Sequence, residues 1–280
     1  MALTATSDPD RIRATLDRLV RVDPVRGTIL GTIAASLDAG GWLATDEGRR
    51  VAVRSGFAYP LVIAGAWNDE ALRELIMLLR AVEGLRGASG PADAVDTVVA
   101  ALWPDRSTQR MGQCLFRLDQ LVEPRGVAGR AFAADSSHRE LVRRWYAAFM
   151  AEVGVIERNS QRAADRALSE GECFFWADQS GAPVSLAARR KAIGGSARIG
   201  PVYTPSEHRG MGYGSAVTAA ATRSVLAEGA VPVLFTDLAN PTSNKIYQAL
   251  GYRPVENRVL VTLTEEEPAH GPATPRRRRS

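Results

Sequence analysis

The chain has 280 residues, of which 45% are hydrophobic and 24% are charged, a balance that excludes a disordered or collagen-like protein. Its net charge of +4 comes entirely from the four arginines at 276–279, because the other basic residues equal the 31 acidic ones, and this argues against a nucleic-acid-binding surface. No uncharged stretch is long enough to span a bilayer, and the N-terminal residues lack the apolar run of a secretion signal. We therefore expect a cytoplasmic protein without membrane contact.

The first half of the chain has the pattern of a mixed α/β unit. The sequence predicts two helices within residues 8–38, strands at 41–44, 51–54 and 61–65, and a helix capped by Asn68. A glycine-rich break at 84–90 precedes a predicted helix at 91–102, and a long strand is predicted at 111–121. Residues 123–126, Glu-Pro-Arg-Gly, are the best position for a domain boundary. We predict an α/β domain over residues 1–123, in which no residues carry recognisable chemistry.

The second half has a sharper order of elements. A strand at 127–133 is followed by a helix that begins after the cap residue Asp135 and by a polar helix at 157–169. The remaining elements are predicted as strands at 172–177, 183–190 and 197–203, a helix from about Gly212, a strand at 231–236, a helix capped by Asn240 and a strand at 252–263. This βααβββαβαβ order predicts a second domain over residues 124–264, with a disordered tail at 265–280.

A glycine-rich loop at 204–214 separates one of these strands from the helix after it. Three glycines at alternate positions would let backbone N–H groups turn toward one point, where the helix N-terminus and Arg209 would add positive charge. The glycines alone fit a phosphate cradle and a tight packing turn equally well. A P-loop is excluded because no Gly-Lys-Ser/Thr follows, and a GxGxxG fingerprint fails because Tyr213 and Ser215 stand where glycine is needed.

These residues carry a resemblance to a known family. Arg209-Gly-Met-Gly-Tyr-Gly214 fits the R/Q-x-x-G-x-G/A signature of the GCN5-related N-acetyltransferases (GNAT). A later segment, Asn240-x-x-x-Asn244-x-x-Tyr247-x-x-x-Gly-Tyr252, and the βααβββαβαβ order also resemble that family. The match covers about half of the chain. It implies an α/β (α+β) GNAT fold with a mixed central sheet and flanking helices, preceded by a second α/β domain that is a candidate degenerate copy, as in bacterial-type tandem GNAT proteins.

The resemblance also implies a reaction and a site. The reaction is transfer of the acetyl group of acetyl-CoA to a primary amine by direct attack, with Tyr247 as the general acid on the leaving thiolate, since a tyrosine with a pKa near 10 stays protonated at neutral pH. The residues implied to contact the coenzyme are Val202, Tyr203, Thr204, Arg209, Gly210, Met211, Gly212, Tyr213, Gly214, Ser215, Asn240 and Asn244.

Other features of the reaction stay open at this point. Glu172, Asp237 and Glu207 are reachable as a general base, but a water relay or an amine that arrives neutral is equally possible. Cys173 lies beside two phenylalanines and is predicted to be a core residue, and the three histidines form no metal-ligand cluster, so no metal is expected. The expected partner is a small-molecule or peptide amine, and the chain is expected to be a monomer or homodimer. The alternatives are a non-catalytic acyl-CoA sensor or interaction module, and an enzyme that uses a longer acyl donor.

Overall fold

The same order of helices and strands occurs twice along the chain. The structure is a computed structural model that describes residues 2–46, 49–153 and 160–264. The first half contains β1 (Thr4–Thr6), α1 (Pro9–Val22), α2 (Thr28–Ala35), β2 (Trp42–Thr45), β3 (Val51–Arg54), β4 (Leu61–Ala64), α3 (Asp69–Leu79), β5 (Gly87–Gly90), α4 (Ala92–Leu102) and β6 (Thr108–Leu118). The second half contains β7 (Arg130–Ala133), α5 (Arg139–Glu152), α6 (Ser160–Ser169), β8 (Cys173–Ala177), β9 (Pro183–Arg189), β10 (Ser196–Tyr203), α7 (Tyr213–Ala227), β11 (Val231–Asp237), α8 (Pro241–Ala249) and β12 (Tyr252–Leu263).

All of these strands belong to one mixed sheet of 12 strands, in the order β1-β2-β3-β4-β5-β12-β6-β11-β10-β9-β8-β7. Strands β1–β5 of the first half are neighbours, and so are β7–β11 of the second half. The last strand of each half is exchanged: β12 lies next to β5, and β6 lies next to β11. The parallel pairs among the described strands are β4 with β5 and β10 with β11, which occupy the same place in the two halves. The two halves therefore repeat one strand topology, in agreement with the predicted mixed α/β fold.

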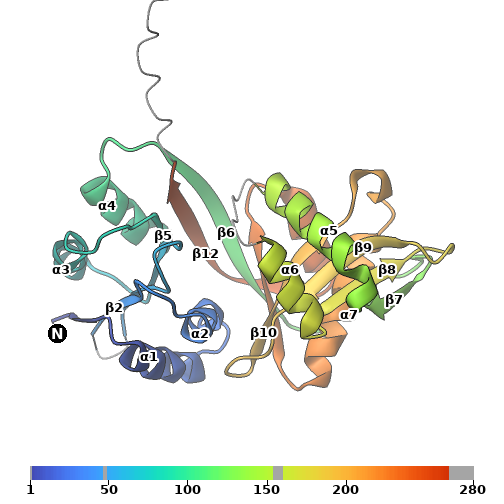
Figure 1. Cartoon of the computed structure of the whole chain (residues 1–280), viewed down its shortest axis with the longest axis horizontal. Helices are drawn as coiled ribbons and strands as arrows, with labels where there is room; N and C mark the ends of the chain where they lie inside the picture. Colours follow the sequence, from blue (N-terminus) through green and yellow to red (C-terminus); the bar gives the residue numbers. More distant parts are fainter. Residues whose placement is uncertain (1, 47–48, 154–159, 265–280) are drawn as a thin grey trace, which may run out of the picture.

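The two longest strands, β6 and β12, join the two halves, as Figure 1 shows. The first part of β12 pairs with β6, and its last part, Val259 to Thr262, also pairs with β5. Val259 and Val261 are consequently buried in the core of the first half, whereas Tyr252 is buried in that of the second. The predicted domain boundary at residue 123 stays a prediction, because each half completes its sheet with a strand from the other.

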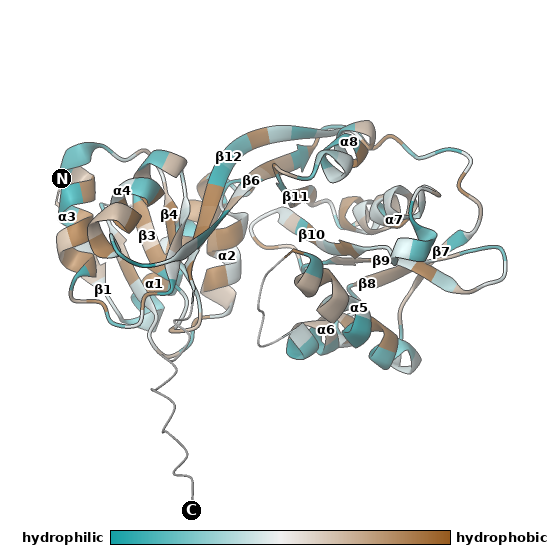
Figure 2. Ribbon diagram, turned by 90° about the horizontal axis from the view of Figure 1, so that it is seen from above, coloured by the Kyte–Doolittle hydropathy of each residue, from teal (hydrophilic) through white to brown (hydrophobic). Residues whose placement is uncertain are grey.

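Helices cover both faces of the sheet in each half (Figure 2). In the first half, α1 and α2 pack on one face, and α3 and α4 pack on the other. In the second half, α5 and α6 cover one face of β8 and β9, while α7 and α8 cover the opposite face of β6, β10 and β11. The side chains of Asp8, Asn68 and Asn240 cap α1, α3 and α8, because each accepts hydrogen bonds from backbone N–H groups of the first turn.

The structure corrects two sequence-based predictions in the first half. The glycine-rich segment before α4 is partly strand β5, whose four residues are all buried. A short strand, β1, was not predicted, because its three residues show no clear alternation. Part of the predicted helix at 157–169 and the predicted tail at 265–280 lie outside the described residues. Within the described residues, no helix combines the length and apolarity needed to cross a membrane, and no His, Cys, Asp and Glu side chains gather into a possible metal site.

Candidate functional site

Strands β10 and β11 separate from each other partway along their length. They pair in parallel from Ser196 to Ile199 of β10, with Leu234 as the last partner on β11. Beyond that point β10 stays paired with β9 through Tyr203, after an irregularity in the register, and β11 stays paired with β6 through Asp237. The strands therefore diverge toward their C-terminal ends, and the backbone of residues 200–203 faces the opening between them.

The loop after β10 leads to the N-terminus of α7 at this opening. Gly210 and Gly212 have φ angles of 78° and 80°, a region that favours glycine. Gly212 is the N-cap of α7, and no side chain caps the helix. A Cβ atom at Gly210 would meet no atom within 4 Å. A Cβ atom at Gly212 would lie 2.9 Å from a side-chain carbon of Val127, so the open space lies at Gly210. The first N–H groups of α7 keep their partial positive charge, and such an uncapped N-terminus is the arrangement that binds anions such as phosphates.

Contacts with neighbouring elements fix the end of β10 next to α7. The hydroxyl of Ser185, on β9, lies 3.1 Å from the carbonyl oxygen of Tyr203, to which it donates, and 2.8 Å from the hydroxyl of Thr204. A Cβ atom at Gly214 would lie 3.3 Å from the Thr204 hydroxyl oxygen, so the glycine permits the close approach of α7. Ser185 could not be predicted as part of this site from the sequence, because no local pattern marks it.

Arg209 is held at both ends of its guanidinium group. Its Nε donates a hydrogen bond to the carbonyl oxygen of Thr204 at 2.9 Å, and its Nη2 pairs with the carboxylate of Glu152, the last residue of α5. Glu152 is the second residue of this region that sequence reasoning missed, because it lies far away along the chain. Met211, also predicted to lie in the site, is 62% exposed.

Helix α8 begins where β11 ends and places two asparagines there. Asn240 is exposed and accepts a hydrogen bond from the N–H of Ser243, so its side chain already has a structural role as the N-cap. The amide nitrogen of Asn244 donates to the carbonyl oxygen of Asp237 at 3.2 Å. The Oδ1 atom of Asn244 is buried and makes no hydrogen bond with a described residue. Such a buried acceptor is costly unless a ligand or water satisfies it.

Tyr247 lies one turn further along α8 and is partly buried. Its ring packs edge-on against Tyr252, with the ring centres 6.2 Å apart. Burial raises the pKa of the Tyr247 hydroxyl to about 12. Within the described part of the chain, that hydroxyl has no hydrogen-bond partner, whereas the hydroxyl of Tyr252 is bonded to Thr222 at 2.7 Å. Tyr247 is therefore a protonated group with a proton to give.

The three carboxylates considered as a general base lie in different environments. Glu172 is 1% exposed and paired with Arg166 of α6 at 3.0 Å, and Glu207 is exposed in the loop before α7. Asp237 ends β11 at the opening, where its carboxylate accepts a hydrogen bond from the N–H of Ala239 at 2.8 Å. Cys173 is buried, and burial raises the pKa of its thiol to about 11, in agreement with the predicted core position.

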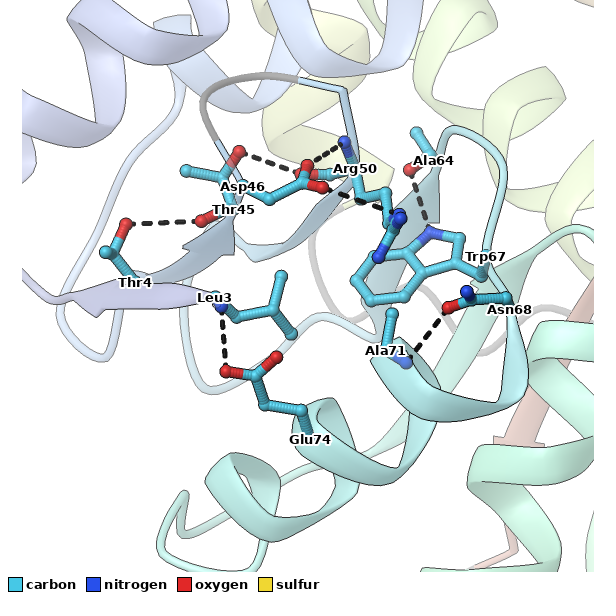
Figure 3. Close-up of polar contacts among 10 residues, drawn as sticks. All are labelled: Leu3, Thr4, Thr45, Asp46, Arg50, Ala64, Trp67, Asn68, Ala71 and Glu74. Carbon is cyan, nitrogen blue, oxygen red and sulfur yellow. Dashed lines mark hydrogen bonds and ion pairs between the residues drawn. The ribbon is translucent and has the colours of Figure 1, made fainter. Parts of the chain in front are cut away.

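The corresponding place in the first half is built differently (Figure 3). Nine residues, 204–212, separate β10 from α7, whereas only four, 65–68, separate β4 from α3. Trp67 fills this short connection, and its indole N–H donates to the carbonyl oxygen of Ala64 at 2.9 Å. The side chain of Asn68 accepts from the N–H of Ala71 at 3.0 Å and so occupies the N-terminus of α3. At α3, the counterpart of α7, the described residues of the first half therefore present a capped helix N-terminus, whereas α7 has no side-chain cap.

Comparison with known proteins gives matches in sequence and in structure. Residues 179–261 match the model of the FR47-like protein family. An acetyltransferase from the GNAT family of Colwellia psychrerythraea has the same fold, with a TM-score of 0.61 at 12% identity over 95% of this chain and 100% of its own. A GCN5-related N-acetyltransferase from Kribbella flavida matches with a TM-score of 0.58 at 18% identity over 88% and 95% of the two chains. No curated protein matches the sequence.

One further match bears on the first half. A tandem GNAT protein from the clavulanic acid biosynthesis pathway matches with a TM-score of 0.54 at 14% identity over 95% of this chain and 99% of its own. At these identities the structural matches establish the fold, and they do so across both halves of the chain.

Proposed function

We propose that this chain is a member of the GCN5-related N-acetyltransferase superfamily and that it transfers the acetyl group of acetyl-CoA to a primary amine. The observation that carries the proposal is the divergence of β10 and β11 beside the uncapped N-terminus of α7. The opening offers backbone groups to an extended chain such as pantetheine, and the helix N-terminus offers N–H groups to a pyrophosphate. Because, among the described residues, this arrangement occurs in the second half and not at α3 of the first, we propose one coenzyme site for the chain.

The residues present fit this substrate. The N–H groups of residues 209–215 would hold the pyrophosphate, and the open space at Gly210 leaves room for it. The main chain of residues 202–204 would pair with the pantetheine arm. The unsatisfied Oδ1 atom of Asn244 would accept a hydrogen bond from a donor in the same opening. Asn240 would contact the coenzyme from the start of α8.

The transfer would be direct. The amine nitrogen attacks the thioester carbonyl carbon, and a backbone N–H at the end of β10 stabilises the resulting oxyanion, a contribution of about 3 kcal/mol in acyl transfer. The carbon–sulfur bond then breaks, and the Tyr247 hydroxyl donates its proton to the departing thiolate. The nitrogen loses its own proton to solvent or to a carboxylate, for which Asp237 is placed best, since Glu172 is buried against Arg166. The acceptor is a small-molecule or peptide amine.

Calorimetric titration with acetyl-CoA tests the site, and a pair of charge variants makes the test specific. Ser215→Glu places a carboxylate in the first turn of α7, where it is favourable for the helix but repels a pyrophosphate. Ala227→Glu places the same charge at the other end of α7 and serves as the control. We expect micromolar binding, about −8 kcal/mol, by the wild type and the control, and none by Ser215→Glu. Absence of binding by the wild type would refute the proposed site.

Release of free thiol in the presence of amines then tests turnover. Acetylation of at least one class of amine supports the transferase. Binding without release across all amine classes would indicate a non-catalytic acyl-CoA sensor. Faster release from a longer acyl-CoA than from acetyl-CoA would identify a different acyl donor.

A further inference from the structure

The first half contains a cavity of about 890 Å³. Ligand pockets for small molecules commonly have volumes of this order. The cavity lies where β2 begins and β3 ends, at the cross-strand pair of Trp42 and Arg54. The connection that contains Trp67 lies at the opposite end of these strands, beside the paired residues Val51 and Ala64. The cavity is thus separate from the proposed coenzyme site and from its counterpart in the first half.

A buried arginine forms one wall of the cavity. Arg54 is 3% exposed, and its Nε and Nη1 donate to the carbonyl oxygens of Gly40 and Glu83 at 2.9 and 2.7 Å. No carboxylate of a described residue lies within ion-pair distance of it, and its desolvation lowers the pKa of the guanidinium. Two carbonyl oxygens do not neutralise a buried positive charge, and buried charges are normally paired. The arrangement calls for an anion.

The rest of the wall favours an anion with one charge and an apolar body. Apolar residues from α1, β2, α3 and the connection after α3 line the cavity, among them Ile12, Trp42, Leu78 and Val82. Two acidic residues, Asp38 and Glu83, also line it, together with a second arginine, Arg13, which is half exposed and already paired with Asp10 at 3.2 Å. The two acids would repel the second charge of a doubly charged group such as a phosphate monoester. A carboxylate matches the planar guanidinium and adds a single charge.

An aromatic side chain stands at the mouth of the cavity. Phe57 is 52% exposed although it is large and apolar, and its ring lies 5.1 Å from the Arg54 guanidinium carbon. It also packs against Gly40, where a Cβ atom would lie 2.7 Å from the ring. Half-exposed aromatic surface beside a buried cation is typical of a binding site.

We propose that this cavity binds a monocarboxylate with an apolar body, with the carboxylate on Arg54 and the apolar part against Trp42 and the end of α3. The proposal does not depend on acyl transfer, because no residue of the proposed coenzyme site lines the cavity.

The test uses the full-length protein and three probes with the same apolar body: octanoate, 1-octanol and octylamine, each below its aggregation concentration. Affinities are measured by calorimetry, with and without acetyl-CoA. We expect octanoate to bind about tenfold or more tightly than octanol, as loss of a hydrogen-bonded charge implies, and octylamine not to bind. Equal affinities of octanoate and octanol would overturn the assignment of the carboxylate to Arg54.

Variants separate the site from non-specific binding. Arg54→Gln should reduce the affinity for octanoate to that for octanol. Because Arg54 also bonds two loops, a second variant is needed. Ala81→Trp fills the cavity from an exposed position just after α3 and should abolish binding. Met77→Trp, on α3 but 74% exposed and outside the cavity, is the matched control and should bind normally. Octanoate binding that survives Ala81→Trp would refute the site, whether or not Arg54→Gln folds.

Discussion

Arg209 donates a hydrogen bond from Nε to the carbonyl oxygen of Thr204 at 2.9 Å, and so links the middle of the glycine-rich loop to its first residue, which follows β10. The same guanidinium pairs with Glu152 on α5. Two segments that are far apart in sequence, the loop and the end of α5, therefore meet at one side chain next to the N-terminus of α7. The arginine shapes the loop in addition to any charge that it offers to a ligand.

Arg209→Ala should weaken acetyl-CoA binding by about tenfold, because it removes both the loop contact and a positive charge. Its cost in unfolding free energy should stay below about 1 kcal/mol, because both partners of the ion pair are half exposed. Calorimetry and chemical denaturation measure the two effects separately. Glu152→Gln keeps the Thr204 contact and should have a smaller effect on affinity. A large loss of stability with unchanged affinity would mean that Arg209 only supports the fold.

Tyr247→Phe should lower kcat by about 100-fold or more with little change in the KM for acetyl-CoA, because the variant keeps the ring but loses the proton donor. Tyr252→Phe, which alters the neighbouring ring, is the control and should retain kcat. Because the pKa of Tyr247 is raised to about 12, the acid stays protonated at neutral and mildly alkaline pH. Deprotonation of Tyr247 should therefore add no falling limb to the kcat profile below about pH 11.

The raised pKa of Tyr247 should also make the free energy of unfolding fall as the pH rises above about 10. The folded state favours the neutral phenol of Tyr247, so the stabilisation is fully present below the ordinary pKa of about 10 and is lost as the pH rises toward 12. Denaturation of wild type and Tyr247→Phe between pH 8 and 11 measures it. The wild type should lose stability faster than the variant above pH 10. Parallel curves would contradict the burial of this hydroxyl.

The chain should bind one acetyl-CoA, since Asn68 caps α3 where Gly212 leaves α7 open. Asn68→Ala should cost about 1 kcal/mol of unfolding free energy and leave acetyl-CoA affinity unchanged. Asn68→Asp keeps the cap and should be close to wild type. Calorimetry measures the number of acetyl-CoA molecules bound per chain and their affinity, and chemical denaturation measures the unfolding free energy of the variants. Two equivalents bound per chain would show that the first half retains a site.

Thr222 and Tyr252 form a buried hydrogen-bonded pair, and substitution of the two residues should lower the free energy of unfolding by different amounts. The Thr222 hydroxyl donates to the carbonyl oxygen of Thr218 at 2.8 Å, so it is left to accept from the Tyr252 hydroxyl. Thr222→Val would leave that phenol without a partner and should cost about 2 kcal/mol, whereas Tyr252→Phe leaves Thr222 bonded and should cost about 1 kcal/mol. Chemical denaturation of both variants and of the double variant measures the difference. The reverse ranking would contradict this assignment of donors.

The sequence predicted most elements of the second half because their patterns are local. The loop at 204–214 and the Asn240–Tyr247 segment are contiguous, so their residues could be named without the fold. Ser185 and Glu152 could not, because they reach the site from residues 19 and 57 positions away.

Strand β5 was missed for a related reason. Its residues, Gly-Ala-Ser-Gly, have little intrinsic preference for a strand, and distant partners impose the conformation. A Cβ atom at Gly87 would lie 2.0 Å from the carbonyl oxygen of Val261, so only glycine permits this pairing. The exchange of β6 and β12 between the halves escaped prediction as well, because periodicity identifies a strand but does not name its neighbour.

The exchange of β6 and β12 means that the first half cannot complete its sheet until the second half has been synthesised. The ribosome makes the first half first, yet the strand that closes its sheet, with Val259 and Val261, is the last of the described strands to be made. The edge of β5 therefore stays unpaired while some 170 further residues are translated, as the positions of Gly90 and Val259 imply. An open edge of this kind invites association with other nascent chains, but one built from glycine, alanine and serine offers them little apolar surface. The small residues of β5, which gave no strand pattern in the sequence, thus lower the risk of aggregation until β12 is synthesised and pairs with it.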